Sequence, residues 1–288
     1  MLITIAIPTY NNEKTIANAI KSALNQDYDE EYEILIANNA SKDRTQDVID
    51  NFKDNKIRVV VNEETYDMYT NHNICLKEAK GDYVLYCHSD DELLPNALSI
   101  LSKKISERNY PKRYILWGHS VYRDFYWSIR RGGQDVNRMF SGEASIRCFL
   151  EGGLTPSGTC YSRQSMIEIG GFPLSSVKSP EMDWAILIIA AFNCFEFEMI
   201  DRLYFKREFA STAKNISDEE WVEMHKDAYR KMFDCISDSQ KVYFVNQMFT
   251  FGPDSNMDSI KEFIPTKLYR KRKLTDLIRK KLYGRMYK

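Results

Sequence analysis

Hydrophobic and polar positions in the first part of the chain follow two periods in turn. The segment Leu2–Ile7 is rich in β-branched residues and ends at Pro8, a pattern that predicts a buried strand. Apolar residues then recur at the three-and-four spacing of one helical face, at Ile16, Ala19, Ile20, Ala23 and Leu24. The chain is therefore predicted to begin with a strand followed by an amphipathic helix.

The same order repeats as far as residue 105. Further strands are predicted at Glu33–Ala37, Ile57–Val61 and Tyr83–Cys87. Helices are predicted at Thr45–Phe52, in a segment ending near Ala79, and in a stretch marked by Leu94, Leu98, Leu101 and Ile105. This alternation predicts an α/β fold with a mainly parallel sheet flanked by helices. Ligands of such sheets bind beyond the carboxyl ends of the strands, so we expect the functional site in the loops that follow them.

The second half of the chain has a less regular pattern. Its longest apolar run, Trp184–Phe192, is shorter than the roughly 17 to 25 residues that cross a bilayer, and it predicts a core helix instead. The run Ser217–Glu220 fits a capping box, and Trp221, Met224, Ala228 and Met232 follow at helical spacing. The C-terminal part is therefore predicted to be helical.

Composition narrows the class of protein. Hydrophobic residues make up 43% of the chain and charged residues 28%, as in soluble globular proteins. The formal net charge of -1 excludes a globally basic nucleic-acid binder, so no nucleic-acid partner is expected. Six scattered cysteines without a C-x-x-C pair indicate reduced thiols. The first residues lack the basic segment and cleavage site of a signal peptide, so a cytoplasmic location is expected.

Small polar clusters follow three of the predicted strands, at Pro8–Asn12, Asn38–Asp43 and His88–Asp91. In the last cluster, the adjacent carboxylates of Asp90 and Asp91 would repel each other unless a cation or hydrogen-bond donors compensated them. A Mg²⁺ or Mn²⁺ ion shared with a substrate diphosphate is one such compensation. The alternative is a solvated acidic loop ahead of the next helix.

Read together, these motifs resemble the family 2 glycosyltransferases of the GT-A fold. Ile5–Asn11 looks like that family's opening strand and nucleotide loop, and Ile36–Asp43 is similar to its second-strand loop. Asn73–Val84 resembles the stretch leading into the metal-binding strand, and His88–Asp91 stands where the family has its D-x-D motif. With weaker later motifs, the resemblance covers about residues 1–215.

The resemblance implies a GT-A, Rossmann-like domain over residues 1–215, with a nucleotide-binding part of about 1–110 and an acceptor-binding part of about 111–215. Residues 216–288 are expected to form a helical C-terminal extension. The implied activity is inverting, metal-dependent transfer of a sugar from a nucleoside-diphosphate sugar, by default a UDP-sugar, to an acceptor hydroxyl. The implied acceptor is a glycan or lipid-linked glycan of O-antigen, capsule or exopolysaccharide synthesis.

The resemblance also implies residue roles. Nucleotide-sugar binding is implied for Pro8, Thr9, Tyr10, Asn11, Asn39, His72, Ser89, Asp90 and Asp91. Asp90 is the implied ligand of Mn²⁺ or Mg²⁺, with His88 and Glu208 as further candidate ligands. Asp183 resembles the family's catalytic base, with Glu181 in reserve. The alternative for Asp183 is a residue that caps the following helix.

Three positions depart from the family pattern, because Asn38, Asn39 and His88 stand where acidic residues are usual. An asparagine amide both donates and accepts hydrogen bonds, so Asn39 could still pair with the edge of a base. Neutral His88 could ligate the metal, contact the ribose or serve as an ordinary loop residue. The departures motivate a second hypothesis, a catalytically impaired protein that binds nucleotide sugars.

The last 22 residues, Lys267–Lys288, interleave ten cationic residues with apolar ones and contain one acid, Asp276. A helix with this pattern could bury its apolar stripe in an anionic membrane surface while its cations meet the headgroups. This predicts a peripheral position on the inner face of the cell membrane. The alternative is a soluble basic tail.

Overall fold

The computed structural model describes residues 1–120, 139–150, 156–177, 181–206, 216–251 and 257–263. The strands are β1 (Ile3–Thr9), β2 (Tyr32–Asn38), β3 (Ile57–Val61), β4 (Tyr83–Tyr86), β5 (Asp91–Leu93), β6 (Tyr114–Ser120), β7 (Met139–Ser141), β8 (Thr159–Ser162) and β9 (Glu196–Lys206). The helices are α1 (Ile16–Leu24), α2 (Thr45–Asp50), α3 (Met68–Glu78), α4 (Ala97–Glu107), α6 (Gly142–Phe149), α7 (Arg163–Glu168), α8 (Met182–Phe192), α9 (Asp218–Asp234), α10 (Asp238–Phe251), α11 (Met257–Ile260) and a 3-10 turn, η3 (Lys261–Phe263).

All these strands belong to one sheet in the order β3-β2-β1-β4-β8-β6-β9-β5, with β7 paired to β9. The first four strands of that order run parallel, and β6 is also parallel to β9. The remaining pairs, which involve β8, β5 and β7, are antiparallel. The predicted α/β class with helices flanking the sheet is confirmed. The sequence pattern did not predict the antiparallel pairing of β5, β7 and β8.

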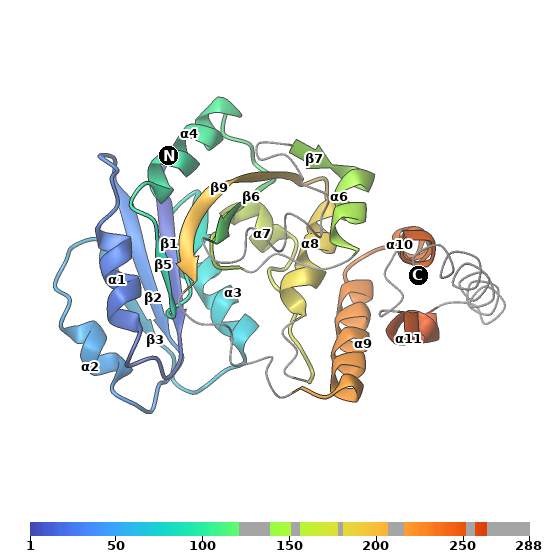
Figure 1. The fold of residues 1–288 in the computed structure, drawn as a ribbon, viewed down its shortest axis with the longest axis horizontal. Helices are drawn as coiled ribbons and strands as arrows, with labels where there is room; N and C mark the ends of the chain where they lie inside the picture. Colours follow the sequence, from blue (N-terminus) through green and yellow to red (C-terminus); the bar gives the residue numbers. More distant parts are fainter. Residues whose placement is uncertain (121–138, 151–155, 178–180, 207–215, 252–256, 264–288) are drawn as a thin grey trace, which may run out of the picture.

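Helices cover both faces of the sheet (Figure 1). Alternate residues of β1 point to opposite cores: Ile5 joins the cluster under α1, α2 and α4, whereas Ala6 joins the cluster under α3, α6 and α8. Strands that are buried on both faces favour apolar residues at successive positions, which explains the apolar run from Ile5 to Pro8 in β1. The carboxyl ends of β1 to β4 therefore meet at one edge of a rigid three-layer structure.

The C-terminal helices share the second of these cores. Apart from Asp183, the residues from Met182 to Ala191 are buried on every side of α8, and α9 packs against that helix. The Trp184 ring lies 5.4 Å from the ring of Tyr229 and 5.9 Å from that of Phe244. The predicted core helix and the predicted capping box are both present. The domain boundary at residue 215 stays a prediction, because residues 207–215 lie outside the described ones.

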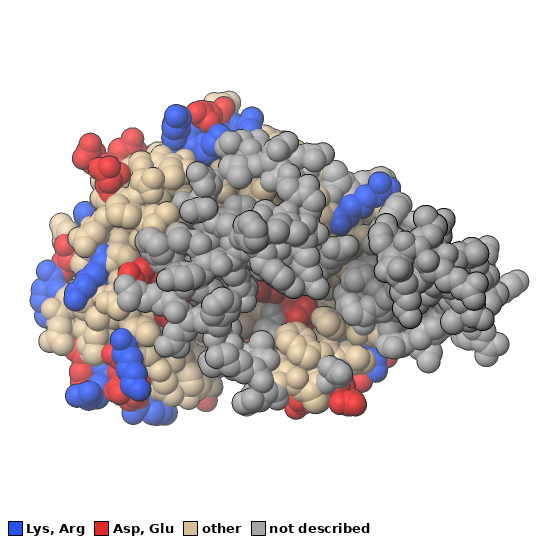
Figure 2. Space-filling model, viewed as in Figure 1, with Lys and Arg blue, Asp and Glu red and all other residues tan. Residues whose placement is uncertain are grey.

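Charges of both signs occur together on the described part of the surface. In Figure 2, Lys and Arg side chains are interspersed with Asp and Glu over the described residues, in keeping with the net charge of -1. All six cysteines are free thiols, as predicted. Among the described helices, none combines the length and the apolar character that a membrane crossing requires.

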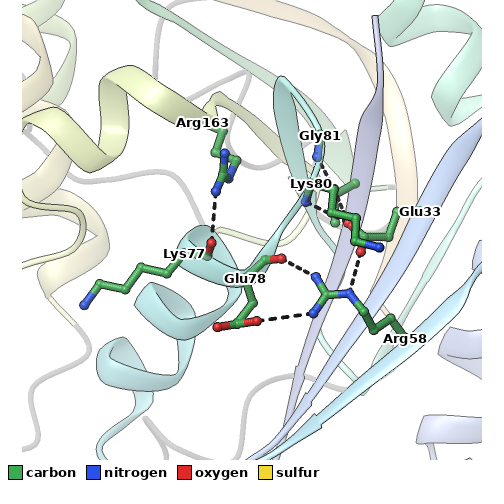
Figure 3. Close-up of polar contacts among 8 residues, drawn as sticks. Glu33, Arg58, Lys77, Glu78, Lys80, Gly81 and Arg163 are labelled. Atoms are coloured by element: carbon green, nitrogen blue, oxygen red, sulfur yellow. Dashed lines mark hydrogen bonds and ion pairs between the residues drawn. The ribbon is translucent and has the colours of Figure 1, made fainter.

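At the edge opposite the predicted site, the buried Glu33 carboxylate joins three elements (Figure 3). It accepts hydrogen bonds from the Thr4 hydroxyl at 2.7 Å, the Lys80 backbone N–H at 2.9 Å and the Arg58 Nε at 2.8 Å. Arg58 also reaches the exposed Glu78, at 3.3 Å. Burial raises the pKa of Glu33, but these donors outweigh it and the pKa lies below the usual 4.5.

Replacing Glu33 with glutamine is expected to lower the free energy of unfolding at pH 7 by about 2 kcal/mol, because a charged acceptor of three hydrogen bonds is lost. The pKa of Glu33 is depressed in the folded state, so its stabilisation is present above pH 4.5 and disappears as the pH falls through the folded value. Urea unfolding at pH 7 and at pH 3 measures both effects.

The control is Glu78→Gln, which removes an exposed partner of the same arginine and should cost under about 1 kcal/mol. Equal losses in the two variants would contradict this account.

Candidate active site

Two of the predicted loops lie side by side at the carboxyl edge of the sheet. The Asn11 side-chain oxygen accepts a hydrogen bond from the Lys42 backbone at 2.7 Å, and the Asn11 backbone donates to the Ser41 hydroxyl at 3.0 Å. The Asn12 backbone donates to the Thr45 hydroxyl at 2.8 Å. These bonds fix the loop after β1 against the loop after β2, so both contribute to one surface.

The asparagines after β2 are buried and hold the neighbouring loops. Asn38 accepts hydrogen bonds from the backbone and hydroxyl of Ser41. The Asn39 oxygen accepts from the Tyr66 backbone N–H and from the Asn62 amide, each at 2.9 Å, while its nitrogen donates to the Tyr66 carbonyl at 2.8 Å. A carboxylate could not make that last bond. In this chain, the amide of Asn39 therefore serves to hold the neighbouring loop at Tyr66.

Pro8 and Thr9 are buried at the end of β1, whereas Tyr10 is 45% exposed just beyond it. The Thr9 carbonyl accepts a hydrogen bond from the Asn39 backbone at 2.9 Å, which ties the ends of β1 and β2 together. The Thr9 hydroxyl is buried and has no hydrogen-bond partner among the described residues. A buried hydroxyl in that state needs an explanation, and a ligand at this edge would supply one.

The loop after β4 folds into a turn in which the Asp91 backbone donates to the His88 carbonyl at 2.9 Å. The turn brings His88, Asp90 and Asp91 together, with one possible ligand atom from each lying within 4.8 Å of the others. Ligand atoms at about 2.0–2.3 Å from a shared cation are separated by up to roughly 4.6 Å, close to the separation found here. The three residues are therefore a candidate donor set for one divalent ion. The predicted Ser89 is buried within the same turn. We call the segment His88–Asp91 the metal-binding turn, after its predicted role.

His72, predicted near the nucleotide, lies on α3 directly against the metal-binding turn. Its Nε2 is 3.1 Å from Nε2 of His88, and its Nδ1 is 2.7 Å from the Met68 carbonyl oxygen. Its ring stacks on that of Tyr86 at 5.1 Å. Burial, followed by the neighbouring His88, lowers the pKa of His72 from its usual 6.5 to about 3, so the imidazole is neutral. The side chain contacts a predicted ligand rather than solvent.

Asp183 lies in the first turn of α8, which begins after Glu181. The capping position is therefore Glu181, which corrects the interpretation of Asp183 as the cap. The Asp183 backbone donates to the Tyr69 hydroxyl at 3.2 Å, while Glu181 lies 3.5 Å from His225 of α9. Burial and then the Asp183 charge raise the pKa of Tyr69, and the same two causes raise that of Tyr161. Both phenols stay protonated beside the predicted base.

A single helix joins the two halves of this site. Tyr69, which contacts the predicted base, and His72, which contacts the metal-binding turn, are neighbours on α3 with ring centroids 5.9 Å apart. We define the buried rings of Tyr69, His72, Tyr86, Tyr161 and Phe172 as the aromatic cluster. Sequence analysis missed the role of Tyr69, because an aromatic residue in the first turn of a helix is typical of an ordinary core position.

Two glycines precede Phe172 of the aromatic cluster, and substitutions there can test how Asn73 holds that residue. Gly170 and Gly171 both have positive φ values, +94° and +71°. A Cβ at position 170 would meet nothing within 4 Å, but a Cβ at 171 would lie 2.3 Å from the Asn73 side-chain oxygen. That asparagine makes two 2.8 Å hydrogen bonds to the backbone of Phe172.

Gly170→Ala is expected to lower the free energy of unfolding by about 1 kcal/mol, the cost of the left-handed conformation alone. Gly171→Ala should lower it by about 3 kcal/mol, because the added methyl also disrupts the two asparagine bonds. Denaturant unfolding of both variants measures the difference. Similar losses in the two would show that Asn73 does not anchor Phe172.

Two sequence predictions cannot be placed on this site. Glu208, a candidate metal ligand, lies outside the described residues, as does the basic segment Lys267–Lys288. Of the remaining predicted residues, the structure brings Pro8, Thr9, Tyr10, Asn11 and Asn39 to the two joined loops, and His72, His88, Ser89, Asp90 and Asp91 to the metal-binding turn. Asp183 is connected to these residues indirectly: its backbone contacts Tyr69, whose ring lies beside that of His72.

The family model described as "Glycosyl transferase family 2" matches residues 4–168, more than half of the chain. The chain belongs to glycosyl transferase family 2. The match includes the loops after β1 and β2 and the segment His88–Asp91, whereas Asp183 lies beyond its end.

Curated relatives of this family 2 chain include bacterial enzymes named for glycan synthesis. The chain is 34% identical over 108 residues to the GalNAc(5)-diNAcBac-PP-undecaprenol beta-1,3-glucosyltransferase of Campylobacter jejuni, covering 36% of this chain and 35% of that protein. It is 31% identical over 113 residues to the UDP-Glc:alpha-D-GlcNAc-diphosphoundecaprenol beta-1,3-glucosyltransferase WfgD of Escherichia coli, covering 39% and 44%. The chain spans less than two thirds of the length of the curated relatives it matches.

Solved structures share the fold over nearly the whole chain. TarS of Staphylococcus aureus, residues 1–349 in complex with UDP-GlcNAc, aligns with a TM-score of 0.68 at 19% identity, covering 93% of this chain and 83% of that one. The mannosyltransferase PcManGT of Pyrobaculum calidifontis, in complex with GDP-Man and Mn²⁺, aligns with a TM-score of 0.57 at 14% identity, covering 96% and 79%. These likenesses establish the predicted GT-A fold for this family 2 chain.

Proposed function

We propose that this family 2 chain transfers a sugar from a nucleoside-diphosphate sugar to an acceptor hydroxyl, with inversion at the sugar carbon. The observation that carries the proposal is the arrangement around α3, which contacts the metal-binding turn through His72 and the carboxylate-bearing turn of α8 through Tyr69. A pyrophosphate site and a general base would thus be held a fixed distance apart on one rigid support.

The donor nucleotide would lie on the joined loops after β1 and β2. The buried Thr9 hydroxyl, which has no partner among the described residues, would meet the nucleoside, and Tyr10 and Asn11 would border it. A uridine donor is favoured because WfgD is named for UDP-Glc and TarS was solved with UDP-GlcNAc. Asn39 would act mainly by fixing the loop at Tyr66, since both ends of its amide already make local bonds.

His88, Asp90 and Asp91 would hold the divalent ion, and PcManGT, solved with Mn²⁺, supports manganese. When bound, the ion neutralises charge on the departing diphosphate. Glu208 remains a further candidate ligand, on sequence grounds alone. Asp90 and His88 are partly exposed whereas Asp91 is buried, so the first two would face the donor.

In the reaction, Asp183 would accept the proton of the acceptor hydroxyl as its oxygen forms a bond to the anomeric carbon. The bond between that carbon and the diphosphate oxygen breaks at the same time, and its electron pair leaves with the nucleoside diphosphate. A single displacement inverts the configuration of the sugar. The phenols of Tyr69 and Tyr161, whose pKa values are raised by burial and by the Asp183 charge, would stay protonated and add no negative charge beside Asp183.

The proposed acceptor is a glycan carried on a lipid diphosphate. The Campylobacter and Escherichia relatives are both named for undecaprenol-linked acceptors, which supports this choice. An acceptor of that kind lies at a membrane surface, where the basic segment Lys267–Lys288 would bind anionic lipids from the cytoplasmic side.

The test is incubation of the full chain with UDP-, GDP-, CDP- and TDP-sugars, with and without Mn²⁺. We expect one nucleotide class to raise the melting temperature in the presence of Mn²⁺, and slow release of the free nucleoside diphosphate from that donor. Binding without release, even with glycan acceptors added, would favour the catalytically impaired nucleotide-sugar-binding protein. If no donor bound, both the transferase and the impaired nucleotide-sugar-binding protein would be contradicted.

A further inference from the structure

The contact between His72 and His88 determines which nitrogen each ring can offer. A backbone carbonyl only accepts hydrogen bonds, so Nδ1 of His72, 2.7 Å from the Met68 oxygen, must carry a hydrogen. The two Nε2 atoms lie 3.1 Å apart, a distance that requires a hydrogen on one of them and a lone pair on the other.

The donor in that contact is His88. If Nε2 of His72 carried the hydrogen, both nitrogens of that ring would be protonated and the ring would be a cation. His72 is 2% exposed and is packed between the rings of Tyr86 and Phe172, where an unpaired charge would be poorly solvated. His72 therefore accepts at Nε2, and His88 donates from its own Nε2. The nitrogen of His88 that bears a lone pair is then Nδ1.

Histidines that ligate metals usually donate their second ring N–H to a fixed partner, which sets the tautomer and the ring orientation. Here the fixed partner is a second histidine, buried and held in turn by its own helix. His88 also shares its turn with Asp90 and Asp91, and one ring nitrogen and one oxygen from each carboxylate lie within 4.8 Å of one another.

We infer that His72 is a positioning residue that locks His88 in the tautomer that ligates a metal through Nδ1, giving this chain a nitrogen-containing site that prefers Mn²⁺ to Mg²⁺. The inference rests on the proposed function, since it concerns the same ion, and it adds the ligand atom, the residue that orients it and the metal preference. Imidazole nitrogen suits transition metals, whereas Mg²⁺ is held by oxygen ligands.

The experiment is pulsed electron paramagnetic resonance of Mn²⁺ bound to the full chain in the presence of UDP, together with Mn²⁺ and Mg²⁺ titrations. We expect a nitrogen hyperfine coupling in the natural chain, which is lost in His88→Ala. His72→Phe keeps an aromatic ring in the cluster but removes the acceptor. It should weaken Mn²⁺ binding about 10–100-fold and abolish or reduce the coupling, with little effect on Mg²⁺.

Two further variants separate positioning from packing. His72→Gln can place its amide oxygen where Nε2 was, so it should retain the coupling and most of the affinity. Phe172→Leu disturbs the packing of His72 without removing either imidazole, and it should retain both as well. If His72→Phe fails to fold, the coupling in the natural chain and its loss in His88→Ala decide whether His88 ligates the ion, and loss of the coupling in His72→Gln would overturn the acceptor role of His72.

Bound Mn²⁺ without any nitrogen coupling would overturn the inference while leaving the proposed metal site intact. An unchanged affinity and coupling in a folded His72→Phe chain would overturn the role of His72 alone. Absence of Mn²⁺ binding with UDP present would overturn this inference together with the proposed metal site.

Discussion

Asp183→Asn is expected to reduce the rate of sugar transfer by a factor of about 100 to 10,000, the range that general-base catalysis contributes. The amide keeps the size of the side chain and leaves the backbone hydrogen bond to Tyr69 in place, so α8 should begin unchanged. It removes only the ability to take up a proton. Donor binding, measured by the melting-temperature shift with nucleotide and Mn²⁺, should stay the same.

The matched control is Glu181→Gln, two residues earlier. Glu181 lies 3.5 Å from His225 of α9, so its carboxylate already has a partner, and its loss should lower the rate far less. If Glu181→Gln were the inactive variant and Asp183→Asn the active one, Glu181 would be the base. An unchanged transfer rate in both variants would show that neither Glu181 nor Asp183 is the catalytic base.

Asp90→Ala is expected to eliminate the Mn²⁺-dependent stabilisation by nucleoside diphosphate. At a ligand concentration of a hundred times Kd, that stabilisation amounts to about 2.7 kcal/mol in the natural chain. Asp90 is one of three residues whose ligand atoms lie within 4.8 Å of one another, and its removal leaves the site one oxygen short. Transfer should fall with it, because charge on the departing diphosphate would no longer be neutralised.

Asp29→Ala is the appropriate control, since Asp29 is an exposed carboxylate ahead of β2, at the edge of the sheet opposite the metal-binding turn. It changes the net charge by the same amount and should leave the stabilisation intact. Full Mn²⁺-dependent stabilisation in Asp90→Ala would mean that the ion, if bound, is held elsewhere.

Local signals explain what the sequence could predict about the fold. The strand Ile57–Val61 and the capping box at Ser217 are specified by residues next to one another, and both are present in the structure. The three-residue strand β5 had no such signal: it begins at Asp91, inside the expected acidic loop, and exists because it pairs with the distant β9. Pairings of that separation are decided by tertiary packing.

The candidate site divides in the same way. Asp90 and Asp91 are candidates because they follow a recognisable strand, and Asp183 is one because it precedes an apolar run. Their roles stay predictions. The contact of His72 with His88 joins a helix to the end of a strand, and no periodic pattern in the sequence predicts it. Likewise, nothing local distinguishes Tyr69 from a residue that merely fills the core.

The position of α3 has a consequence for changing this protein's specificity. Because one helix contacts both the proposed proton acceptor and the proposed cation ligand, through Tyr69 and His72, a shift along its axis would misalign the two together. The loops after β1 and β2 are secured by their own bonds, through Asn11 and Asn39. Donor choice should therefore be open to redesign by exchanging those loops, whereas acceptor redesign that disturbs α3 would sacrifice turnover.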